Sequence, residues 1–424
     1  MDTVRSLIKK YTAPAVFNFL QPYYHQGLAL IGALKCNYPS RQLTIIAVTG
    51  TKGKSTTTEL IAQILRGQGY TVASLSTIQF TIGDHTERNK FKMTTPGRFF
   101  VQTFLRQAVT AGCTHAVLEI SSEAVKQFRH KYIELDALVF TNLTPEHIES
   151  HGSFEKYKAA KLELAKAVAT SPKRPRVIVA NSDDMHGQDF LAYEAETKIP
   201  YGLKNLSLYT LHKDSVSLVF EGVTIRVPIA GLFNVYNALA AIKVCQAFGV
   251  SVGSAAEALR TLKPIAGRVE QFESPKESSK QVTAVVDYAH TTDSLEKLYQ
   301  AFPDKPKICV LGNTGGGRDT WKRPEMGAIA EQYCEHIILT NEDPYDENPK
   351  KIIDDMVKGI KNQGKLTIIM DRKEAIRTAL ELAPNGGYVL VSGKGTDPYI
   401  MEANGKKTPW SDAEVVKELL AELA

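Results

Sequence analysis

Cysteine is scarce in this sequence and does not occur in pairs. The 424 residues include five cysteines, and none has the close spacing of a metal site or of a disulfide framework. An odd number of isolated cysteines is typical of reduced thiols in a reducing compartment. We therefore expect five free thiols, at Cys36, Cys113, Cys245, Cys309 and Cys334.

Long hydrophobic runs are also absent. No stretch approaches the roughly 20 consecutive apolar residues that a membrane-spanning helix needs. The N-terminus lacks a cleavable signal pattern, because Lys9, Lys10 and Tyr11 precede a broken apolar stretch. The sequence thus predicts a cytoplasmic protein.

A strong excess of one charge is missing too. The net charge of +5 is small for this length and arises from scattered lysines. No dense basic block is interleaved with aromatic residues, so we expect anionic small molecules as partners and no nucleic acid. The chain has no internal repeat, and its length exceeds what one hydrophobic core supports, which predicts two or three units.

The most informative segment that is present is a phosphate-binding loop at residues 45–56. An apolar run, Leu43 to Val48, leads into glycines and then into an amphipathic helix. Backbone N–H groups of such a loop close around phosphate oxygens, and the helix start adds its positive end. A mere glycine-rich turn would not explain Lys-Ser at the helix start. We expect ATP to bind at Gly50, Thr51, Lys52, Gly53, Lys54, Ser55 and Thr56.

Two α/β units follow a short leader. Residues 1–40 are helix-like and aromatic, and predict either a helical cap or an amphipathic segment that contacts a membrane surface. From 41 to 262, strand-like runs alternate with helical ones, as in a mostly parallel sheet, with an antiparallel hairpin near 206–228. Strands are expected at 116–120, 137–140 and 176–180, and a long helix at 234–248.

The second unit, residues 263–424, is predicted to be a Rossmann-like, doubly wound α/β domain. Glycine-rich or polar loops follow three of its strands, and ligands bind at the carboxyl ends of strands in such sheets. The expected strands are 283–287, 307–311, 336–340, 366–370 and 388–392, and the loops are 312–317, 341–349 and 393–398.

Four polar groups beside these strands are candidates for chemistry. Glu119 ends a strand, where it is either a Mg²⁺ ligand or an exposed charge. His147 is either a metal ligand or a loop histidine, and Lys161 lies on a helix, where lysines are usually solvated. Asp287 and His290 could contact a ribose and a phosphate, although this pair alone is a weak motif.

Together, the motifs resemble the Mur ligase superfamily, and most closely its UDP-N-acetylmuramyl-tripeptide synthetases. The resemblance covers roughly residues 43–424, and its motifs occur in family order. They lie at 48–56, 94–96, 119–122, 129, 140–147, 151–161, 231–237, 267–270, 287–290, 317–324 and 393–395.

This resemblance implies a role for each matching residue. ATP and two Mg²⁺ ions would be cofactors, with Ser55, Glu119, His147 and a carbamylated Lys161 at the metals, and Lys54, Lys161, His147 and Arg318 in catalysis. Arg318 would pair with the carboxylate of the incoming amino acid. The nucleotide would also contact Asn234, Asn237, Arg268, Asp287 and His290. Acceptor and amino acid would contact Thr94, Thr95, Ser121, Arg129, Asp343, Tyr345, Gly393 and Asp397.

The chain also departs from the family pattern. Only some 40 residues precede the loop where the family has a UDP-binding domain, so we expect weak recognition of uridine. Glu123 stands where the family has histidine. Tyr345 replaces the arginine that selects diaminopimelate, and Asp343 and Asp397 put negative charge nearby, which favours lysine or another amine.

The implied reaction is ATP-dependent amide formation. Phosphoryl transfer converts a carboxylate of a muramyl-peptide-like acceptor to an acyl phosphate, which the amine of an amino acid attacks. This activity belongs to peptidoglycan precursor synthesis, and we expect a monomer. The alternatives are a folylpolyglutamate synthetase-like ligase, a ligase acting on a lipid-linked precursor, and a nucleotide-binding subunit without catalysis.

Overall fold

The computed structural model describes residues 14–146, 148–303, 305–317 and 319–422, and for residues 14–20 and 148 it describes the backbone only. The chain forms two compact units. The first comprises the described residues up to Leu143, with Glu155–Tyr201 and Ala240–Ser251, and the second comprises Thr144–Phe154, Gly202–Leu239 and the residues from Val252 onward.

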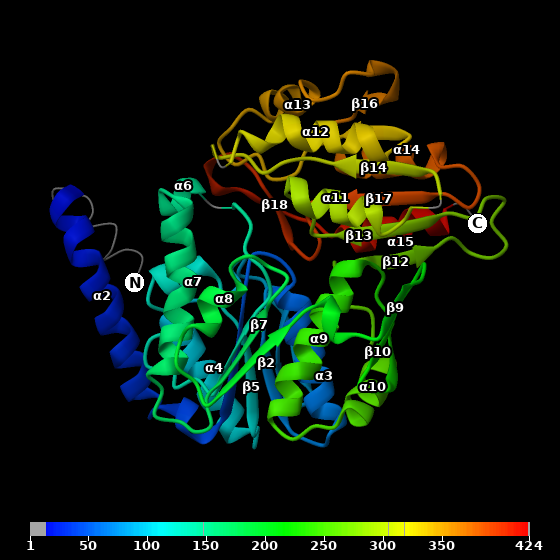
Figure 1. Cartoon of the computed structure of the whole chain (residues 1–424). Coiled ribbons are helices and arrows are strands. Elements are labelled where there is room, and N and C mark those ends of the chain that lie inside the picture. Colours follow the sequence, from blue (N-terminus) through cyan, green and yellow to red (C-terminus); the bar gives the residue numbers. More distant parts are fainter. Residues whose placement is uncertain (1–13, 147, 304, 318, 423–424) are drawn as a thin grey trace. The chain divides into compact units, whose positions relative to one another are not determined.

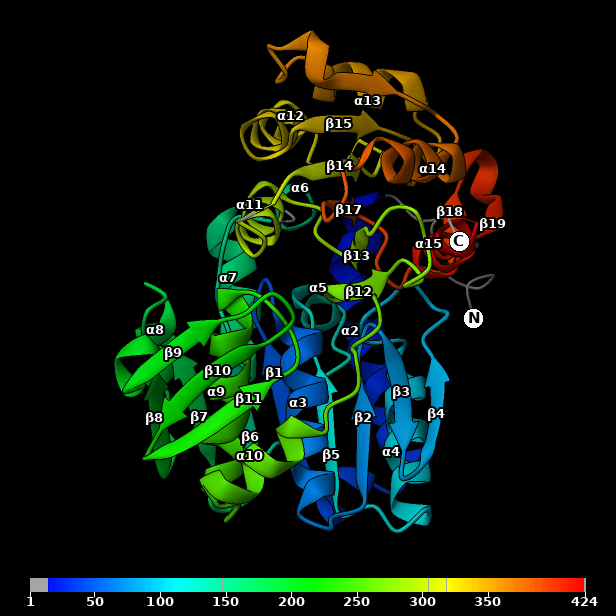
Figure 2. The same cartoon turned by 90° about the vertical axis from the view of Figure 1, so that its right-hand side faces the viewer.

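The first unit is built on an eight-stranded sheet in the order β4-β3-β2-β5-β1-β6-β7-β8. In this order, all neighbouring strands from β2 to β8 (β2-β5-β1-β6-β7-β8) are parallel. β3 and β4 pair antiparallel and form the edge on the right in Figure 2. This confirms the predicted, mostly parallel sheet. The strands are β1 (Thr44–Thr49), β2 (Val72–Leu75), β3 (Gln79–Ile82), β4 (His85–Arg88), β5 (His115–Glu119), β6 (Ala137–Phe140), β7 (Val177–Asn181) and β8 (Thr197–Tyr201).

The central strands carry continuous β-branched and aliphatic runs because both of their faces are buried. β1 lies between β5 and β6, so its carboxyl end is in the middle of the sheet. The helices of this unit are α2 (Pro14–Lys35), α3 (Lys54–Gly67), α4 (Arg98–Thr110), α5 (Ser122–Lys126), α7 (Phe154–Ala169) and α8 (Gly187–Leu191), with Phe154 itself assigned to the second unit.

The leader is helical where it is described. α2 packs against α4 (Figure 1). Ala29 and Ala33 are fully buried, while Tyr23, Ile31 and Leu34 are exposed. Small buried residues at a spacing of four let the two helices approach closely. The described part of the leader is therefore a helix packed on the first unit.

A three-stranded antiparallel sheet occupies the predicted hairpin region. Its order is β11-β10-β9, so the segment contributes three strands, one more than a hairpin. The strands are β9 (Leu208–Leu211), β10 (Val216–Phe220) and β11 (Val223–Val227), and the helices α9 (Leu232–Ala247) and α10 (Val252–Arg260) follow. α10 packs on β11, and α9 continues from the second unit into the first.

The second unit also contains a six-stranded sheet in the order β12-β13-β17-β14-β15-β16. Only β12 is antiparallel to its neighbour, and the predicted strands all form. α14 and α15 share a hydrophobic core with one face of the sheet. The strands are β12 (Glu270–Glu273), β13 (Thr283–Asp287), β14 (Lys307–Leu311), β15 (His336–Leu339), β16 (Leu366–Ile368) and β17 (Tyr388–Ser392), followed by the pair β18 (Tyr399–Met401) and β19 (Lys407–Pro409).

The helices of this unit mostly alternate with its strands, as in a doubly wound fold. α11, α12 and α13 contact one another in sequence. They are α6 (Ile148–His151), α11 (Thr292–Gln300), α12 (Lys322–Tyr333), α13 (Pro349–Val357), α14 (Arg372–Leu382) and α15 (Asp412–Ala421).

The expectation of five free thiols is wrong in this structure. Cys309 on β14 and Cys334 after α12 form a disulfide, and their Cα atoms lie 6.1 Å apart. The sequence separation of 25 residues gave no indication of this, because the pairing depends on α12 returning beside β14. Cys36, Cys113 and Cys245 are free thiols.

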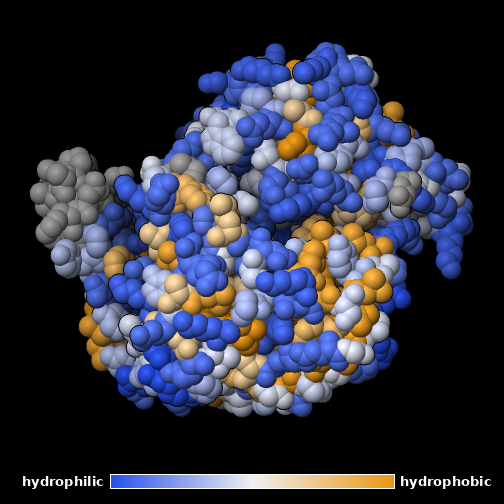
Figure 3. Space-filling model, in the orientation of Figure 1, coloured by the Kyte–Doolittle hydropathy of each residue, from blue (hydrophilic) through white to orange (hydrophobic). Residues whose placement is uncertain are grey.

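None of the described helices combines the length and the apolar character needed to cross a membrane. On the face shown in Figure 3, hydrophilic and hydrophobic residues are intermixed.

Candidate nucleotide and ligase sites

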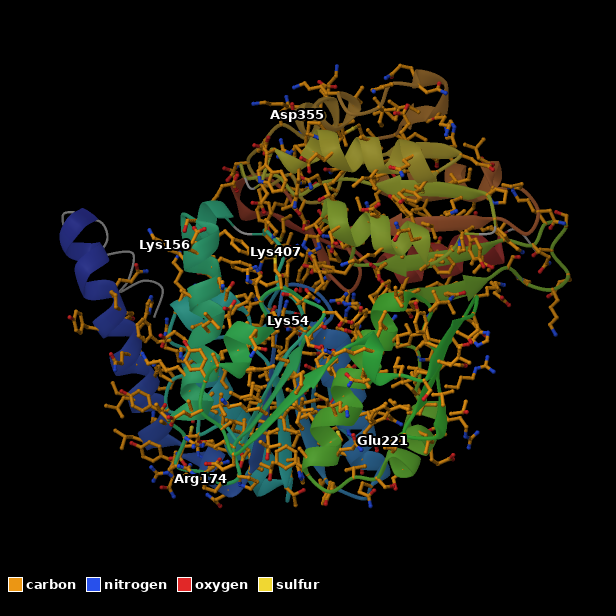
Figure 4. All side chains as sticks on the ribbon, in the orientation of Figure 1. Lys54, Lys156, Arg174, Glu221, Asp355 and Lys407 are labelled. Carbon is orange, nitrogen blue, oxygen red and sulfur yellow. A yellow bond between two sulfur atoms is a disulfide. The ribbon has the colours of Figure 1, made fainter. Side chains whose placement is uncertain are left out.

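The phosphate loop lies at the carboxyl end of β1, and α3 begins at Lys54, which is labelled in Figure 4. Gly50 has φ of 149°, and a Cβ there would lie 1.9 Å from Thr141 Oγ1, so only glycine fits. Gly53 precedes the helix with φ of 82°, again a glycine conformation. Ser55 is buried, and Lys54 is half-buried with its Nζ donating to Thr51 O at 2.9 Å.

Asn142, to which the sequence assigned no role, fixes the shape of this loop. Its Oδ1 accepts from the Lys52 N–H at 2.9 Å, its Nδ2 donates to Lys52 O at 3.0 Å, and its carbonyl accepts from the Thr51 N–H at 2.8 Å. Thr141 Oγ1 donates to Lys52 O at 2.7 Å. The available signal was the position of these polar residues directly after the strand 137–140.

Lys161 is buried, unlike the exposed Lys156 on the same helix. Its Nζ donates to Gly50 O at 2.6 Å and lies 4.7 Å from the centre of the Tyr157 ring. Tyr157 Oη is 3.0 Å from Thr51 Oγ1. Helical periodicity did not distinguish this lysine from its neighbours, whereas packing against the loop does.

Glu119 is buried at the end of β5, in register with Val48 of β1. Its carboxylate accepts from the Thr77 N–H at 2.7 Å and from Thr77 Oγ1 at 3.0 Å. Thr77 Oγ1 also lies 2.9 Å from Thr94 Oγ1, and Thr95 Oγ1 donates to Glu119 O at 2.9 Å. The structure thus brings Glu119 together with the predicted acceptor residues Thr94 and Thr95.

Arg129 belongs to the same group. It donates to Thr95 O and, at 2.8 Å, to Gln127 Oε1. Burial lowers the pKa of its guanidinium. Glu123, which replaces the family's histidine, accepts from Gln127 Nε2 at 2.7 Å, and Ser121 caps α5 by accepting from the Ala124 N–H.

In the second unit, Asp287 ends β13 with both oxygens engaged. They accept from the N–H groups of Val269 at 2.9 Å and Ala289 at 2.7 Å. His290 contacts Tyr288 O at 2.7 Å and Glu146 Oε1 at 3.0 Å through its two ring nitrogens. In this structure Asp287 therefore shapes the loop that carries His290.

The other predicted nucleotide contacts of this unit lie on two segments. Asn237 donates to Asn234 Oδ1 at 2.9 Å, both side chains being buried on α9. The Arg268 guanidinium stacks 4.7 Å from the centre of the Tyr288 ring. The negative charge of Asp397 and burial raise the pKa of Tyr288 well above its usual value, so this phenol stays protonated.

The predicted amine-binding residues surround a buried lysine that the sequence left without a role. Lys394 Nζ donates to Asp343 Oδ1 at 2.8 Å and to Tyr399 O at 2.6 Å, and lies 3.7 Å from Asp397 Oδ2. Its ammonium offsets the negative charges of Asp343 and Asp397, which the sequence analysis expected to attract the amine of the substrate. Tyr345 has φ of 52° and donates its N–H to Met401 O at 3.0 Å.

Glu342 lies beside this cluster. Burial, and then the negative charge of Asp343, raise the pKa of its carboxyl group. Its Oε1 accepts from Thr314 Oγ1 at 2.9 Å, while its buried Oε2 has no hydrogen-bond partner. Gly393 has φ of 107°, and a Cβ there would lie 2.2 Å from that oxygen, so glycine is required.

His147 and Arg318 lie outside the described residues. On α12, Arg323 is fully buried and donates twice to Glu347, at 2.7 and 2.8 Å, and once to Asp355 at 3.1 Å. Glu347 in turn accepts from the Gly317 N–H at 3.2 Å. Glu347 thus links its own loop, 341–349, to α12 through Arg323 and to the loop 312–317 through Gly317.

Comparison with known proteins identifies the family. The Mur ligase middle domain matches residues 48–245, and the Mur ligase, glutamate ligase domain matches residues 267–395. The chain is 35% identical over 414 residues to the UDP-N-acetylmuramoyl-L-alanyl-D-glutamate--2,6-diaminopimelate ligase of Thermosynechococcus vestitus, covering 95% of this chain and 81% of that protein.

Two solved structures share the fold. One is a UDP-N-acetylmuramoyl-L-alanyl-D-glutamate--2,6-diaminopimelate ligase, with a TM-score of 0.60 and 30% identity over 89% of this chain and 78% of that one. The other is a Mycobacterium tuberculosis folylpolyglutamate synthase complexed with ADP, with a TM-score of 0.68 but only 15% identity over 87% and 91%. The phosphate loop, the ordered motifs and these matches together show that the chain belongs to the Mur ligase family, whose members are ATP-dependent amide ligases.

Proposed function

We propose that this protein uses ATP to join an amino acid to a muramyl-peptide-like carboxylate in peptidoglycan precursor synthesis. The observation that supports this most is the contact between Lys161 and Gly50, because it joins a buried helix lysine to the phosphate loop of a Mur ligase middle domain. The proposed limits are 1–40 for the leader, 41–262 for the ATP-binding domain and 263–424 for the ligase domain.

ATP would bind with its phosphates against the N–H groups of residues 50–56. Asn142 holds Thr51 and Lys52 in place before the nucleotide arrives, which lowers the entropy lost on binding. Lys54 would exchange its contact with Thr51 O for the β- and γ-phosphates. Its positive charge then stabilises the charge that develops on the transferred phosphoryl group.

The donor set of the first unit fits Mg²⁺, which Mur ligases generally require. Ser55 offers a hydroxyl oxygen and Glu119 a carboxylate, and hard oxygen ligands suit this ion. A carbamate on Lys161 would replace a buried cation by an anion beside Gly50. The family resemblance alone assigns His147 as a ligand of a second ion. Bound Mg²⁺ would supply charge neutralisation of the phosphates.

An activated carboxylate is needed because hydroxide is a poor leaving group. The acceptor carboxylate attacks the γ-phosphorus of ATP, which releases ADP and gives an acyl phosphate. The amine of the amino acid then attacks the acyl carbon, and phosphate leaves with the bonding electrons. Arg129, Thr94 and Thr95 would hold the acceptor, and Arg318 the α-carboxylate of the amino acid.

The test is a screen of purified protein for phosphate release against a matrix of acceptors and amino acids. UDP-muramyl dipeptide, the same dipeptide without UDP, a lipid-linked muramyl peptide and a folate should be compared. Product mass should rise by one amino acid less water. The proposal fails if no muramyl peptide supports amine-dependent phosphate release while a folate or no acceptor at all does.

A further inference from the structure

α2 carries a buried histidine that contacts the first unit through an arginine. His25 is 4% exposed, and Arg98 Nη2 donates to its Nδ1. Since a guanidinium has no acceptor, Nδ1 must be the accepting nitrogen, which fixes the tautomer with its proton on Nε2. This hydrogen bond links the leader helix to the start of α4.

The contact continues from Arg98 toward the acceptor residues. Arg98 Nε donates to Gln127 O at 2.9 Å. The side chain of Gln127 donates to Glu123 at 2.7 Å and accepts from Arg129 Nη2 at 2.8 Å. Arg129 Nη1 in turn donates to Thr95 O. Three residues, Arg98, Gln127 and Arg129, thus connect His25 to the Thr94–Thr95 loop.

The last members of this chain of hydrogen bonds are rigidly held. Thr95 Oγ1 donates to Glu119 O at 2.9 Å. Arg129 is 9% exposed, and its Nε is buried without a hydrogen-bond partner. A buried donor without a partner costs free energy unless another group supplies an acceptor. A bound carbonyl or carboxylate at this position would satisfy Arg129.

We infer that His25 is a positioning residue, which orders Gln127 through Arg98 and so aims the Arg129 guanidinium at the acceptor. This inference rests on the proposed function for the identity of that acceptor. The helix α2 would then contribute to acceptor binding without touching the acceptor. This contribution depends on the hydrogen bond that His25 Nδ1 accepts from Arg98, and substitutions of either residue can test that bond.

The experiment compares four variants of the full chain. His25→Leu removes the acceptor, and His25→Asn keeps an acceptor near the place of Nδ1. Arg98→Met breaks the same contact from the other side, without changing α2. Gln26→Leu, at the exposed neighbouring position, controls for an added apolar side chain on this helix.

Two measurements are made on each variant. For His25→Leu and Arg98→Met we expect KM for the acceptor to rise about tenfold, the loss of one hydrogen bond to a charged group, with KM for ATP unchanged. We expect amide hydrogen exchange at residues 94–96 and 127–130 to be about tenfold faster in both. His25→Asn should restore both values toward those of the wild type.

The inference is overturned if His25→Leu matches Gln26→Leu in both measurements, or if His25→Asn is as impaired as His25→Leu. Hydrogen exchange is read without substrate, so it decides the positioning role even if no muramyl peptide is an acceptor. Absence of turnover by the wild-type protein would instead contradict the proposed function alone.

Discussion

Lys161 Nζ lies 2.6 Å from the carbonyl oxygen of Gly50, which joins the middle of α7 to the first glycine of the phosphate loop. The two residues are 111 positions apart, yet both are buried or conformationally fixed at this contact. We propose that this lysine acts on the nucleotide, either as an ammonium or as a carbamate.

Replacing Lys161 by alanine should inactivate the enzyme. If the working form is the carbamate, bicarbonate or a short carboxylic acid should partly restore phosphate release by supplying the missing anion. The exposed Lys156→Ala, on the same helix, is the matched control and should retain activity. Full activity of Lys161→Ala without additives would remove the carbamate from the mechanism.

Lys54→Ala should abolish ATP turnover without unfolding the protein. The side chain is half-buried at the start of α3 and is not part of the hydrophobic core. Phosphate release and the thermal midpoint should be measured together, with the exposed Lys35→Ala as control. Substantial phosphate release by Lys54→Ala would exclude this lysine from phosphoryl transfer.

Glu342 should make stability depend on pH. Its pKa is raised in the folded state, so the folded protein binds more protons than the unfolded chain above the ordinary glutamate pKa of about 4.3. The free energy of unfolding should therefore fall as pH rises from that value through the raised pKa. Glu342→Gln should lack this component, so its free energy of unfolding relative to the wild type should increase from pH 5 to pH 8. The measurement is denaturant unfolding of both proteins at these two pH values, and an equal difference between them at pH 5 and pH 8 would contradict the prediction.

The amine preference should exclude diaminopimelate. Tyr345 offers one neutral hydrogen bond where an arginine would pair with the second carboxylate, a loss of about 2 kcal/mol or roughly thirtyfold in specificity. Because Lys394 offsets Asp343 and Asp397, the preference depends mainly on this missing arginine. The measurement is kcat/KM for lysine, ornithine and diaminopimelate, and a clear preference for diaminopimelate would mean that the pocket is misinterpreted.

The disulfide between Cys309 and Cys334 should be detectable and stabilising. The denatured, unreduced chain should show three free thiols and the reduced chain five, since the sequence has five cysteines. Closing this 25-residue separation should stabilise the fold by about 3 kcal/mol. Five reactive thiols before reduction would show that the purified protein is reduced.

Local patterns were sufficient to predict many of the buried strands and the nucleotide loop. β6, β13, β14 and β17 have the predicted bounds, because continuous apolar runs bounded by turn residues encode buried parallel strands. The short strands β2, β3, β4 and β12 were not predicted. Three of them lie at or next to a sheet edge, where partial exposure weakens the apolar pattern.

The sequence by itself determined the α/β class, the phosphate loop and the Mur ligase family, because each depends on residues close together in the chain. Only the tertiary structure decided which polar residues act together. The contacts of Asn142 with Lys52, Lys161 with Gly50, Lys394 with Asp343 and His25 with Arg98 all join residues far apart in the chain. Their energies come from burial and from hydrogen bonds that exist only once the strands have assembled, and no spacing along the chain records them.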